Sequence, residues 1–330
     1  MLYAGKTYKI YNYINLLFIN NVKILYNWVN QQEIILSLIN NIKSSETISN
    51  NNLNINYNIY KNKISEHLSK YYKPLNDNDL GYYLAGLIDA KGIINKNNGN
   101  IIINYNVKDI QALYWLKSKL KYGKVKKLNE SNYNLIISNN KGLLFILNII
   151  NNKLKLISKY NDIFNYLINN NDYIKSNFNN NFELSNNNLN FNNHWLSGFI
   201  DGNGIFNTNI NYDNNNLPLP IINLKFKLKL NTYNNEDLYI LNDISYFICN
   251  INNKYKNDNN NISYYCLEFD LLNINKNIIC YLDKYPLVNN SNYLKYLYFR
   301  KTYIYIKHKL YLNELGLKKI NKFNIKINKL

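Results

Sequence analysis

Two aspartates occupy the same place in two similar nine-residue segments of this chain. The first segment, LAGLIDAKG, covers residues 84–92, and the second, LSGFIDGNG, covers residues 196–204. Asp89 and Asp201 are the sixth residues of these segments. Carboxylates can accept hydrogen bonds near a helix end, or they can serve as oxygen ligands for a hard metal ion. A repeat of this size indicates two similar half-domains.

Each segment has the pattern of a helix that ends at a glycine. In the first copy Leu84, Leu87 and Ile88 follow i, i+3, i+4 spacing, and the second copy repeats this apolar stripe. Small residues beside the stripe would let another backbone come close. Asn or Asp residues before each copy suit a helix start, and the final glycine suits a helix exit. We therefore predict helices over residues 79–89 and 193–201.

Together the two copies resemble the doubled motif of the LAGLIDADG proteins, which are intron-encoded homing endonucleases and related RNA maturases. The resemblance covers about residues 76–310. It implies an α+β fold in which two pseudo-symmetric αββαββα half-domains carry antiparallel sheets that form a nucleic-acid-binding saddle. The two motif helices would pack side by side at the centre. In the nucleases of this family, the acid at the eighth place of each motif reaches the bound metal ions and the scissile phosphates.

This chain departs from the family pattern at the eighth place. It has Lys91 there in the first copy and Asn203 in the second. Lysine is a cation with donors only and asparagine offers a neutral carbonyl oxygen, whereas Mg²⁺ is held mainly through carboxylates. By the family pattern no catalytic residue and no metal ligand is intact, so we expect no cofactor, with Mg²⁺ needed only if the chain is an active nuclease. Asp89 and Asp201 are weak substitutes, because the sixth place lies about 200° around the helix from the eighth.

The chain carries a strong excess of positive charge. Its formal net charge is +18, from 39 basic and 21 acidic residues. Such an excess suits a polyanionic partner, either nucleic acid or an acidic membrane surface. Asn, Ile, Lys and Tyr dominate the composition, as expected of a very A+T-rich gene, so the positions of the lysines are better evidence than their number. No apolar run is long enough to cross a bilayer, and we expect no membrane span.

Composition and resemblance together indicate an organelle-encoded protein, with the mitochondrion as its location. The stretch 1–30 contains no Arg, and no transit peptide is expected. Three cysteines, Cys249, Cys266 and Cys280, and three scattered histidines fit neither a disulfide framework nor paired metal-ligand spacing. The internal repeat implies a monomer with an internal pseudo-two-fold axis.

We expect two half-domains joined by a linker and flanked by two extensions. Residues 142–167 have the pattern of one long apolar helical region, and residues 317–330 could form a basic arm. The expected stretches are an N-terminal extension with an Asn-rich linker (1–75), the first half-domain (76–168), a linker (169–193), the second half-domain (194–310) and a basic C-terminal tail (311–330).

The strand expected at residues 221–230 alternates apolar residues with lysines. Period-2 alternation places the apolar set on one face and three ammonium groups on the other, about 6.6–7 Å apart along the strand. An antiparallel sheet covered by helices on one face leaves its other face open. These lysines could therefore meet successive phosphates, and in the family this face is the one that binds nucleic acid. The expected nucleic-acid contacts are Lys225, Lys227, Lys229, Lys124, Lys126 and Lys96.

Three functions remain open at this point. The first is a group I intron RNA maturase with a degenerate nuclease site, which needs a basic rigid scaffold and no metal-binding acids. The second is an active site-specific DNA homing endonuclease, which needs acids at both motif ends. The third is a DNA or RNA binder without enzymatic activity, or a decaying reading frame. The eighth-place residues favour the first. The partner is accordingly expected to be group I intron RNA, duplex DNA, or both.

Overall fold

The computed structural model describes residues 64–68, 73–74, 76–178, 181–185, 190–212, 220–231, 235–249, 256–257 and 264–330. The chain divides into two compact units, residues 1–56 and 57–330, and all described residues belong to the second unit. Most of the expected N-terminal extension, residues 1–75, lies outside the described residues.

The first half follows the order expected from the motif resemblance. Its four strands pair antiparallel in the order β1-β2-β4-β3. Buried Ile101, Ile103 and Tyr105 alternate along β2 with more exposed residues, so one face of the sheet packs into the core. The elements are α2 (Asp77–Lys91), β1 (Gly92–Ile94), β2 (Ile101–Asn106), α3 (Ile110–Leu120), β3 (Lys124–Lys127), β4 (Asn132–Ile137) and α4 (Asn140–Ile150).

The second half repeats this order and the sheet topology. Its strands pair antiparallel in the order β5-β6-β8-β7, the counterpart of the first sheet. The expected arrangement of two αββαββα halves in an α+β fold is confirmed. The elements are α7 (Trp195–Asn203), β5 (Gly204–Asn211), β6 (Ile221–Asn231), α8 (Tyr239–Cys249), β7 (Lys256–Asn257), β8 (Tyr264–Phe269) and α9 (Leu272–Lys284).

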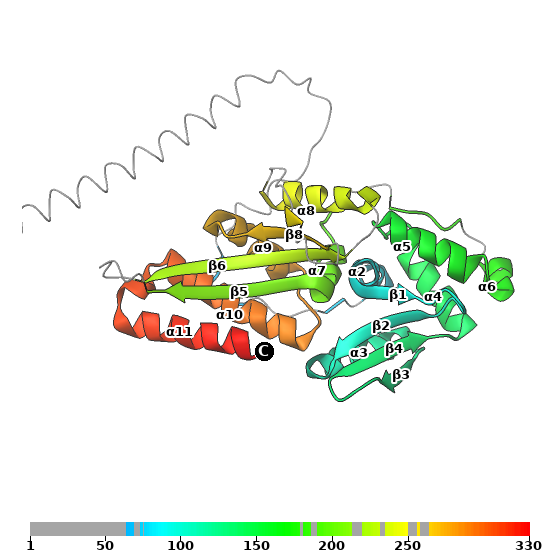
Figure 1. The fold of residues 1–330 in the computed structure, drawn as a ribbon, viewed down its shortest axis with the longest axis horizontal. Coiled ribbons are helices and arrows are strands. Elements are labelled where there is room, and N and C mark those ends of the chain that lie inside the picture. Colours follow the sequence, from blue (N-terminus) through cyan, green and yellow to red (C-terminus); the bar gives the residue numbers. More distant parts are fainter. Residues whose placement is uncertain are drawn as a thin grey trace, which may run out of the picture. The chain divides into compact units, whose positions relative to one another are not determined.

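The motif helices α2 and α7 pack side by side between the two sheets (Figure 1). A Cβ atom added to Gly86 would lie 1.9 Å from the carbonyl oxygen of Trp195, and one added to Gly198 would lie 2.0 Å from that of Tyr83. The two contacts are equivalent, because Gly86 and Gly198 hold the same place in their motifs and Tyr83 and Trp195 do as well. A pseudo-two-fold axis between the helices requires this equivalence. Helix α2 extends past its predicted range at both ends and α7 is shifted toward the C-terminus, but their adjacency confirms the prediction.

The sequence pattern predicts one long helical region over residues 142–167, but the structure does not form a single helix there. Helix α4 ends at Ile150, and Asn152 adopts a left-handed backbone conformation with φ 57°. The chain then continues as α5 (Ile157–Asp162) and the π-helical η3 (Ile163–Ile168). The break has a physical reason, because the backbone between these helices donates hydrogen bonds to the carboxylate of Asp89.

Residues that the sequence suggested to be a linker and an arm contain packed elements. Within 169–193, α6 (Asp172–Asn177) buries Ile174, and Phe191 is also buried. Beyond α10 (Asn290–Lys307) and η5 (Leu310–Leu312), the chain forms α11 (Glu314–Lys329). Ile320 and Ile327, two turns apart on one helix face, are buried. Residues 317–330 are therefore part of a packed helix and not a free arm. Among the described residues, no helix is both long and apolar enough to cross a membrane.

Candidate nucleic-acid interface

The sixth-place aspartate of the first motif is buried and engaged in hydrogen bonds through both oxygens. Asp89 Oδ2 accepts hydrogen bonds from the backbone N–H of Lys155 at 2.8 Å and from Trp195 Nε1 at 2.9 Å. Oδ1 accepts a longer one from the N–H of Leu156 at 3.4 Å. Burial raises the pKa of Asp89 to about 7, although these donors oppose the rise. Asp89 thus joins a loop of its own half to the motif helix of the other half.

The second motif repeats this arrangement with the roles of the halves exchanged. Asp201 Oδ2 accepts hydrogen bonds from the backbone N–H groups of Val288 and Asn289, at 2.7 and 3.1 Å, and from the hydroxyl of Tyr83 at 3.0 Å. Tyr83 and Trp195 hold equivalent places, since each directly precedes the first leucine of its motif. Burial raises the pKa of Asp201 to about 6. Both sixth-place acids therefore accept hydrogen bonds near a helix end, the first of the two roles considered for them.

The eighth-place residues turn to different partners. The Nζ atom of Lys91 lies 4.4 Å from the ring centroid of Tyr105 on β2. Burial lowers the pKa of Lys91, and the nearby charges of Asp201 and Asp109 oppose that change. Asn203, the second eighth-place residue, is uncharged, and its side chain bonds to the other motif helix.

Asn203 uses its amide to hold the two motif helices together. Its Nδ2 donates to the carbonyl oxygen of Ala90 at 2.9 Å. Neither Asn203 nor Lys91 supplies an anionic oxygen, so the residues at this place do not fit a Mg²⁺ ion. Within the described ranges, no group of three or more His, Cys, Asp or Glu side chains could hold a metal ion.

A second pair of aspartates also connects the halves. Asp109, just before α3, accepts hydrogen bonds from the backbone N–H of Ser291 at 2.8 Å and from its hydroxyl at 2.7 Å, at the start of α10. Asp237, just before α8, accepts from the N–H of Ser158 at 3.1 Å, at the start of α5. Each acid therefore satisfies a helix N-terminus in the other half, where an anion is favoured. Neither aspartate belongs to the nine-residue motif, so the repeat does not indicate this pair.

The second sheet presents its lysines as the strand pattern predicts, but an acid lies among them. Leu224, Phe226, Leu228 and Leu230 of β6 are buried, and the intervening lysines are partly exposed. Glu268 on β8 pairs with Lys225 at 2.9 Å and with Lys227 at 3.1 Å. The hydrogen bond from Lys225 lowers the pKa of Glu268 and raises that of Lys225.

Glu268 is not among the site residues expected from the sequence. Its alternation with buried Leu267 and Phe269 in β8 indicates an outward side chain. The pairing with Lys225 and Lys227 depends on the register of β6 against β8, in which Lys227 lies opposite Glu268. Sequence alternation alone does not set that register.

The lysines of the first half divide between two surfaces. Lys124 and Lys126 are exposed on β3 and alternate with Val125, which lies opposite buried Leu135. These two lysines therefore lie on the open face of the first sheet. Lys96 lies in the turn between β1 and β2, and its Nζ is 5.4 Å from the ring centroid of Tyr166 in η3. The structure thus brings Lys124 and Lys126 onto one face and places Lys96 against the helical layer.

Comparison with known proteins gives consistent matches. A family model described as LAGLIDADG endonuclease matches residues 196–303. The uncharacterized cox1 intron-2 protein of Schizosaccharomyces pombe is 34% identical over 335 residues, covering 98% of this chain and 95% of its own length. The intron-encoded DNA endonuclease aI3 of Saccharomyces cerevisiae is 29% identical over 299 residues, covering 79% of this chain and 69% of its own length.

Solved structures agree with these matches at the level of the fold. The meganuclease I-SmaMI, solved bound to uncleavable DNA, superposes with a TM-score of 0.59 at 16% identity, covering 74% of this chain and 97% of its own. At that identity the likeness concerns the fold alone. The doubled motif, the central helix pair, the paired sheets and the sequence relatives lead to one conclusion: the chain belongs to the LAGLIDADG family.

Proposed function

We propose that this chain is a nucleic-acid-binding protein of intron origin that acts as a group I intron RNA maturase, with no working nuclease site. The observation that carries the proposal is the pair of eighth-place residues. Lys91 lies over the ring of Tyr105, and Asn203 donates to the carbonyl of Ala90, so neither offers a carboxylate where the family's nucleases hold metal. The S. pombe and S. cerevisiae relatives are both named as intron products, which supports the intron origin.

The charge of Lys91 strengthens the argument against metal-dependent cleavage. At about 4 Å, an ammonium and a divalent cation repel by about 8 kcal/mol at an effective dielectric constant of 20, twice the value for unit charges. The same ammonium suits a phosphate oxygen, since lysine binds phosphate as a point charge. A basic scaffold that lacks the metal ligands can therefore still bind a polyanion through the open faces of its two sheets, which form the expected saddle.

Two further features of the proposal concern where and how the chain works. Its A+T-rich composition and the cox1 intron name of the S. pombe relative support a mitochondrial, organelle-encoded protein. Both halves of the central helix pair come from one chain, and this supports a monomer. Group I intron RNA is the proposed partner, and duplex DNA is the partner if the nuclease is active.

The test compares cleavage with splicing for the same purified protein. Wild-type protein is incubated in Mg²⁺ with a DNA that carries the uninterrupted intron-insertion site, and separately with the host intron RNA under conditions of poor self-splicing. We expect no specific DNA cleavage and a faster splicing rate. The Lys91→Asp and Asn203→Asp double variant is the matched comparison, because it restores both eighth-place acids. Splicing that is unchanged by the protein would refute the proposal.

A DNA homing endonuclease is the second candidate, and one observation favours it. Within the described residues, Asp201 Oδ1 is buried and has no hydrogen-bond partner, so the protein leaves one acidic oxygen near the motif end unused. The S. cerevisiae relative is also named as a DNA endonuclease. Site-specific, Mg²⁺-dependent cleavage by the wild-type chain, lost in a folded Asp201→Asn variant, would establish this candidate in place of the maturase.

A further inference from the structure

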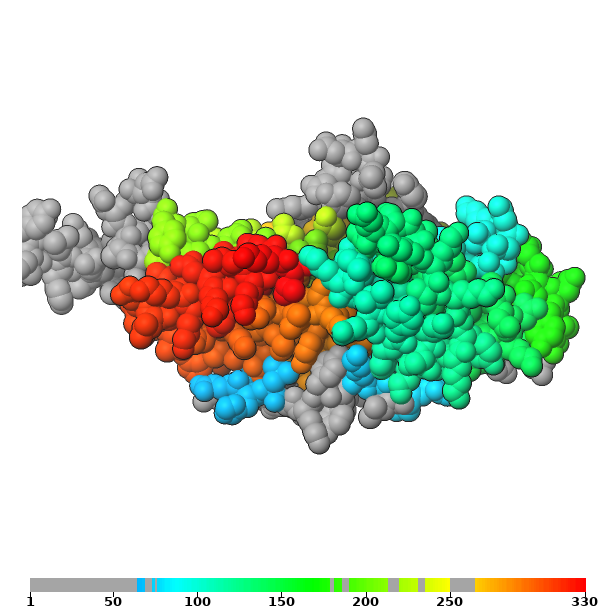
Figure 2. Space-filling model, turned by 90° about the horizontal axis from the view of Figure 1, so that it is seen from below, coloured from blue at the N-terminus to red at the C-terminus, as the bar shows by residue number. Residues whose placement is uncertain are grey.

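A pocket of about 630 Å³ lies on the helical side of the second half, between α10, α11 and the segment 64–68. Figure 2 shows this face, with α10 (orange) lying between α11 (red) and residues 64–68 (blue). Arg300 ties the segment to α10, because its Nη2 donates to the carbonyl oxygen of Ser65 at 2.7 Å. The volume is within the range of sites that bind small molecules, about 300–1,000 Å³.

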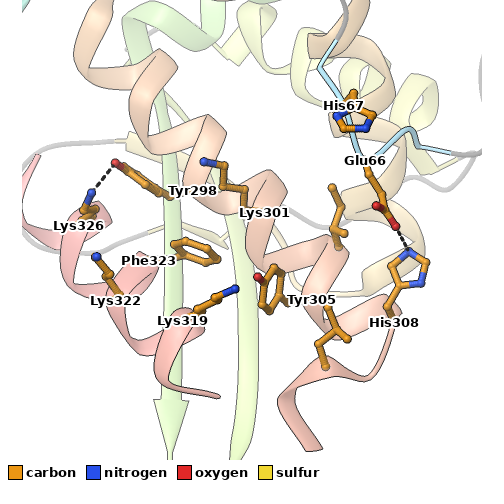
Figure 3. Close-up of a pocket in the computed structure, with 12 residues that line it drawn as sticks. Glu66, His67, Tyr298, Lys301, Tyr305, His308, Lys319, Lys322, Phe323 and Lys326 are labelled. Carbon is orange, nitrogen blue, oxygen red and sulfur yellow. Dashed lines mark hydrogen bonds and ion pairs between the residues drawn. The ribbon is translucent and has the colours of Figure 1, made fainter. Parts of the chain in front are cut away.

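Two helical stripes build the walls of the pocket. The first stripe has 3, 4, 3 spacing and consists of Tyr298, Lys301 and Tyr305 of α10 and of His308, the residue that caps this helix. The stripe on α11 has 3, 1, 3 spacing and consists of Lys319, Lys322, Phe323 and Lys326. Residues with such spacing lie on one face of a helix. The short connection through η5 folds the two helices against each other, so both stripes line the same hollow (Figure 3).

Three aromatic rings contact one another in series inside the pocket. The ring of Phe323 lies between the other two, stacked on Tyr298 at 6.0 Å between centroids and edge-on to Tyr305 at 5.5 Å (Figure 3). Lysine ammonium groups cover these rings: Lys301 is 5.7 Å from the centroid of Tyr298, and Lys319 is 5.9 Å from that of Tyr305. Lysine side chains are flexible. A flat ligand can therefore displace the ammonium groups from the rings and still contact them.

The charge of the lining is strongly positive. Among the described residues, four lysines and one acid line the pocket; the acid is Glu66, whose Oε1 lies 4.0 Å from Nε2 of His308 at one end. Lys326 adds a hydrogen bond from its Nζ to the hydroxyl of Tyr298 at 3.1 Å. An occupant that matches both the charge and the rings must be anionic and must also carry a flat unsaturated group.

We propose that this pocket binds unpaired nucleotides of a single-stranded nucleic acid, with a base stacked on the ring of Tyr305 and phosphates at the lysines. Aromatic platforms beside lysines bind single strands with little sequence preference, because every base has a π-face. A paired base cannot reach such a platform, since its faces are stacked within the helix. A duplex would therefore compete poorly for the pocket.

The proposed site is separate from the sheet faces of the second half. Phe299 of α10 packs on Phe206 of β5 with ring centroids 5.2 Å apart, so α10 covers the buried face of that sheet. The β6 lysines are on the opposite face. The pocket therefore goes beyond the proposed function: it adds a second contact surface, and its existence does not depend on whether the chain splices RNA or cleaves DNA.

The test measures binding of the full chain to fluorescein-labelled single-stranded RNA and DNA of one sequence, about ten nucleotides long, by fluorescence anisotropy. The pocket variant changes Lys301 and Lys319 to Gln. The control variant changes Lys307 and Lys318 to Gln, which removes the same charge from the same two helices outside the pocket lining. If these two lysines contact two phosphates of a single strand, the slope of log K against log salt should become shallower in the pocket variant by about 1.4, at about 0.7 for each contact.

A third variant tests the aromatic platform at constant charge. Tyr305→Leu should weaken single-strand binding by about tenfold, within the range measured for loss of one stacked base. Duplex binding by the sheet faces should be unchanged in both pocket variants. Equal affinities and slopes for the pocket and control variants would overturn the proposal, as would a loss of binding to vesicles of acidic phospholipid with single-strand binding intact. Weaker binding of the pocket variants to RNA and DNA alike, or to RNA alone, supports the proposed site and shows whether it distinguishes RNA from DNA.

Discussion

Glu268 should weaken nucleic-acid binding by the second sheet, and its removal should strengthen it. The carboxylate is shared by two of the three β6 lysines, at 2.9 Å from Lys225 and 3.1 Å from Lys227. Among the described side chains, this face therefore carries the ammonium groups of Lys225, Lys227 and Lys229 with the opposing carboxylate of Glu268 among them. Glu268→Gln removes the negative charge and keeps a side chain of nearly the same size that can still accept a hydrogen bond from lysine.

The magnitude follows from the geometry. A phosphate oxygen held about 2.8 Å from an ammonium nitrogen would lie about 6 Å from the carboxylate on the other side of that nitrogen. Two unit charges at about 6 Å repel by about 0.7 kcal/mol in a medium of dielectric constant about 80, which corresponds to about a threefold change in affinity. With a phosphate at each of the two lysines, the expected gain is about tenfold at low salt. At about 0.15 M salt the Debye length is about 8 Å, so the gain per phosphate should fall below about twofold.

Filter binding to a labelled DNA duplex, at about 0.01 M and about 0.15 M salt, measures this effect. Glu314→Gln is the control, because Glu314 also pairs with a lysine but belongs to α11 and not to the strands that carry Lys225, Lys227 and Glu268. An unchanged or lower affinity of Glu268→Gln at low salt would contradict the assignment of this face to phosphate binding. Changing Lys225, Lys227 and Lys229 to Ala should act in the opposite direction and lower the salt slope by about 2.7, at about 0.9 for each duplex phosphate contact.

Two further predictions concern the stability of the helix pair. Gly86→Ala should lower the free energy of unfolding by about 1–3 kcal/mol or more in urea titrations, because the new methyl meets backbone. Gly202→Ala places a methyl 2.3 Å from the Cβ of Ala90, so adding Ala90→Gly should restore most of its loss; failure of this rescue would contradict the packing. Burial raises the pKa of Asp89 to about 7 and of Asp201 to about 6, so folding favours the protonated form of both groups. Their contribution to the free energy of unfolding is complete below about pH 4 and is lost as the pH rises through these pKa values. Asp89→Asn should therefore flatten the decline in stability between about pH 4 and 7, which is worth at most about 4 kcal/mol for a shift of about three pKa units; an unaltered pH profile would show that Asp89 does not titrate there.

Most of the fold could be predicted from local patterns. The nine-residue repeat indicated the central helices, and period-2 alternation indicated the strand later seen as β6, because both patterns are periodic over a whole element. The prediction of one long helix over residues 142–167 was wrong because of a tertiary contact. Its apolar residues keep helical spacing, but the backbone at Lys155 and Leu156 must turn its N–H groups toward Asp89. No property of that segment alone indicates where this acceptor lies.

The candidate site could be predicted only in part, for the same reason. The absence of eighth-place acids can be read directly from Lys91 and Asn203. The contact of Lys91 with Tyr105 and the pairing of Glu268 with two lysines arise from elements that meet only in the folded chain. The pocket was also not recognised, although its stripe on α11 has helical spacing, since residues 317–330 were expected to form an arm and not to pack against α10.

The distribution of hydrogen bonds explains how a chain of this family can keep its fold without the eighth-place acids. Several of the hydrogen bonds that join the halves are made by the sixth-place acids: Asp89 and Asp201 each accept from a loop of their own half and from an aromatic side chain of the other half. Removing either acid would leave several buried donors without a partner, at about 1–3 kcal/mol each. Lys91 acts on this network through its charge near Asp201. Asn203 adds a contact that an aspartate could not make, because a carboxylate cannot donate to the carbonyl of Ala90. The residue at the eighth place of each motif can therefore change while the scaffold that presents the lysines is retained, which is the arrangement that the proposed function requires.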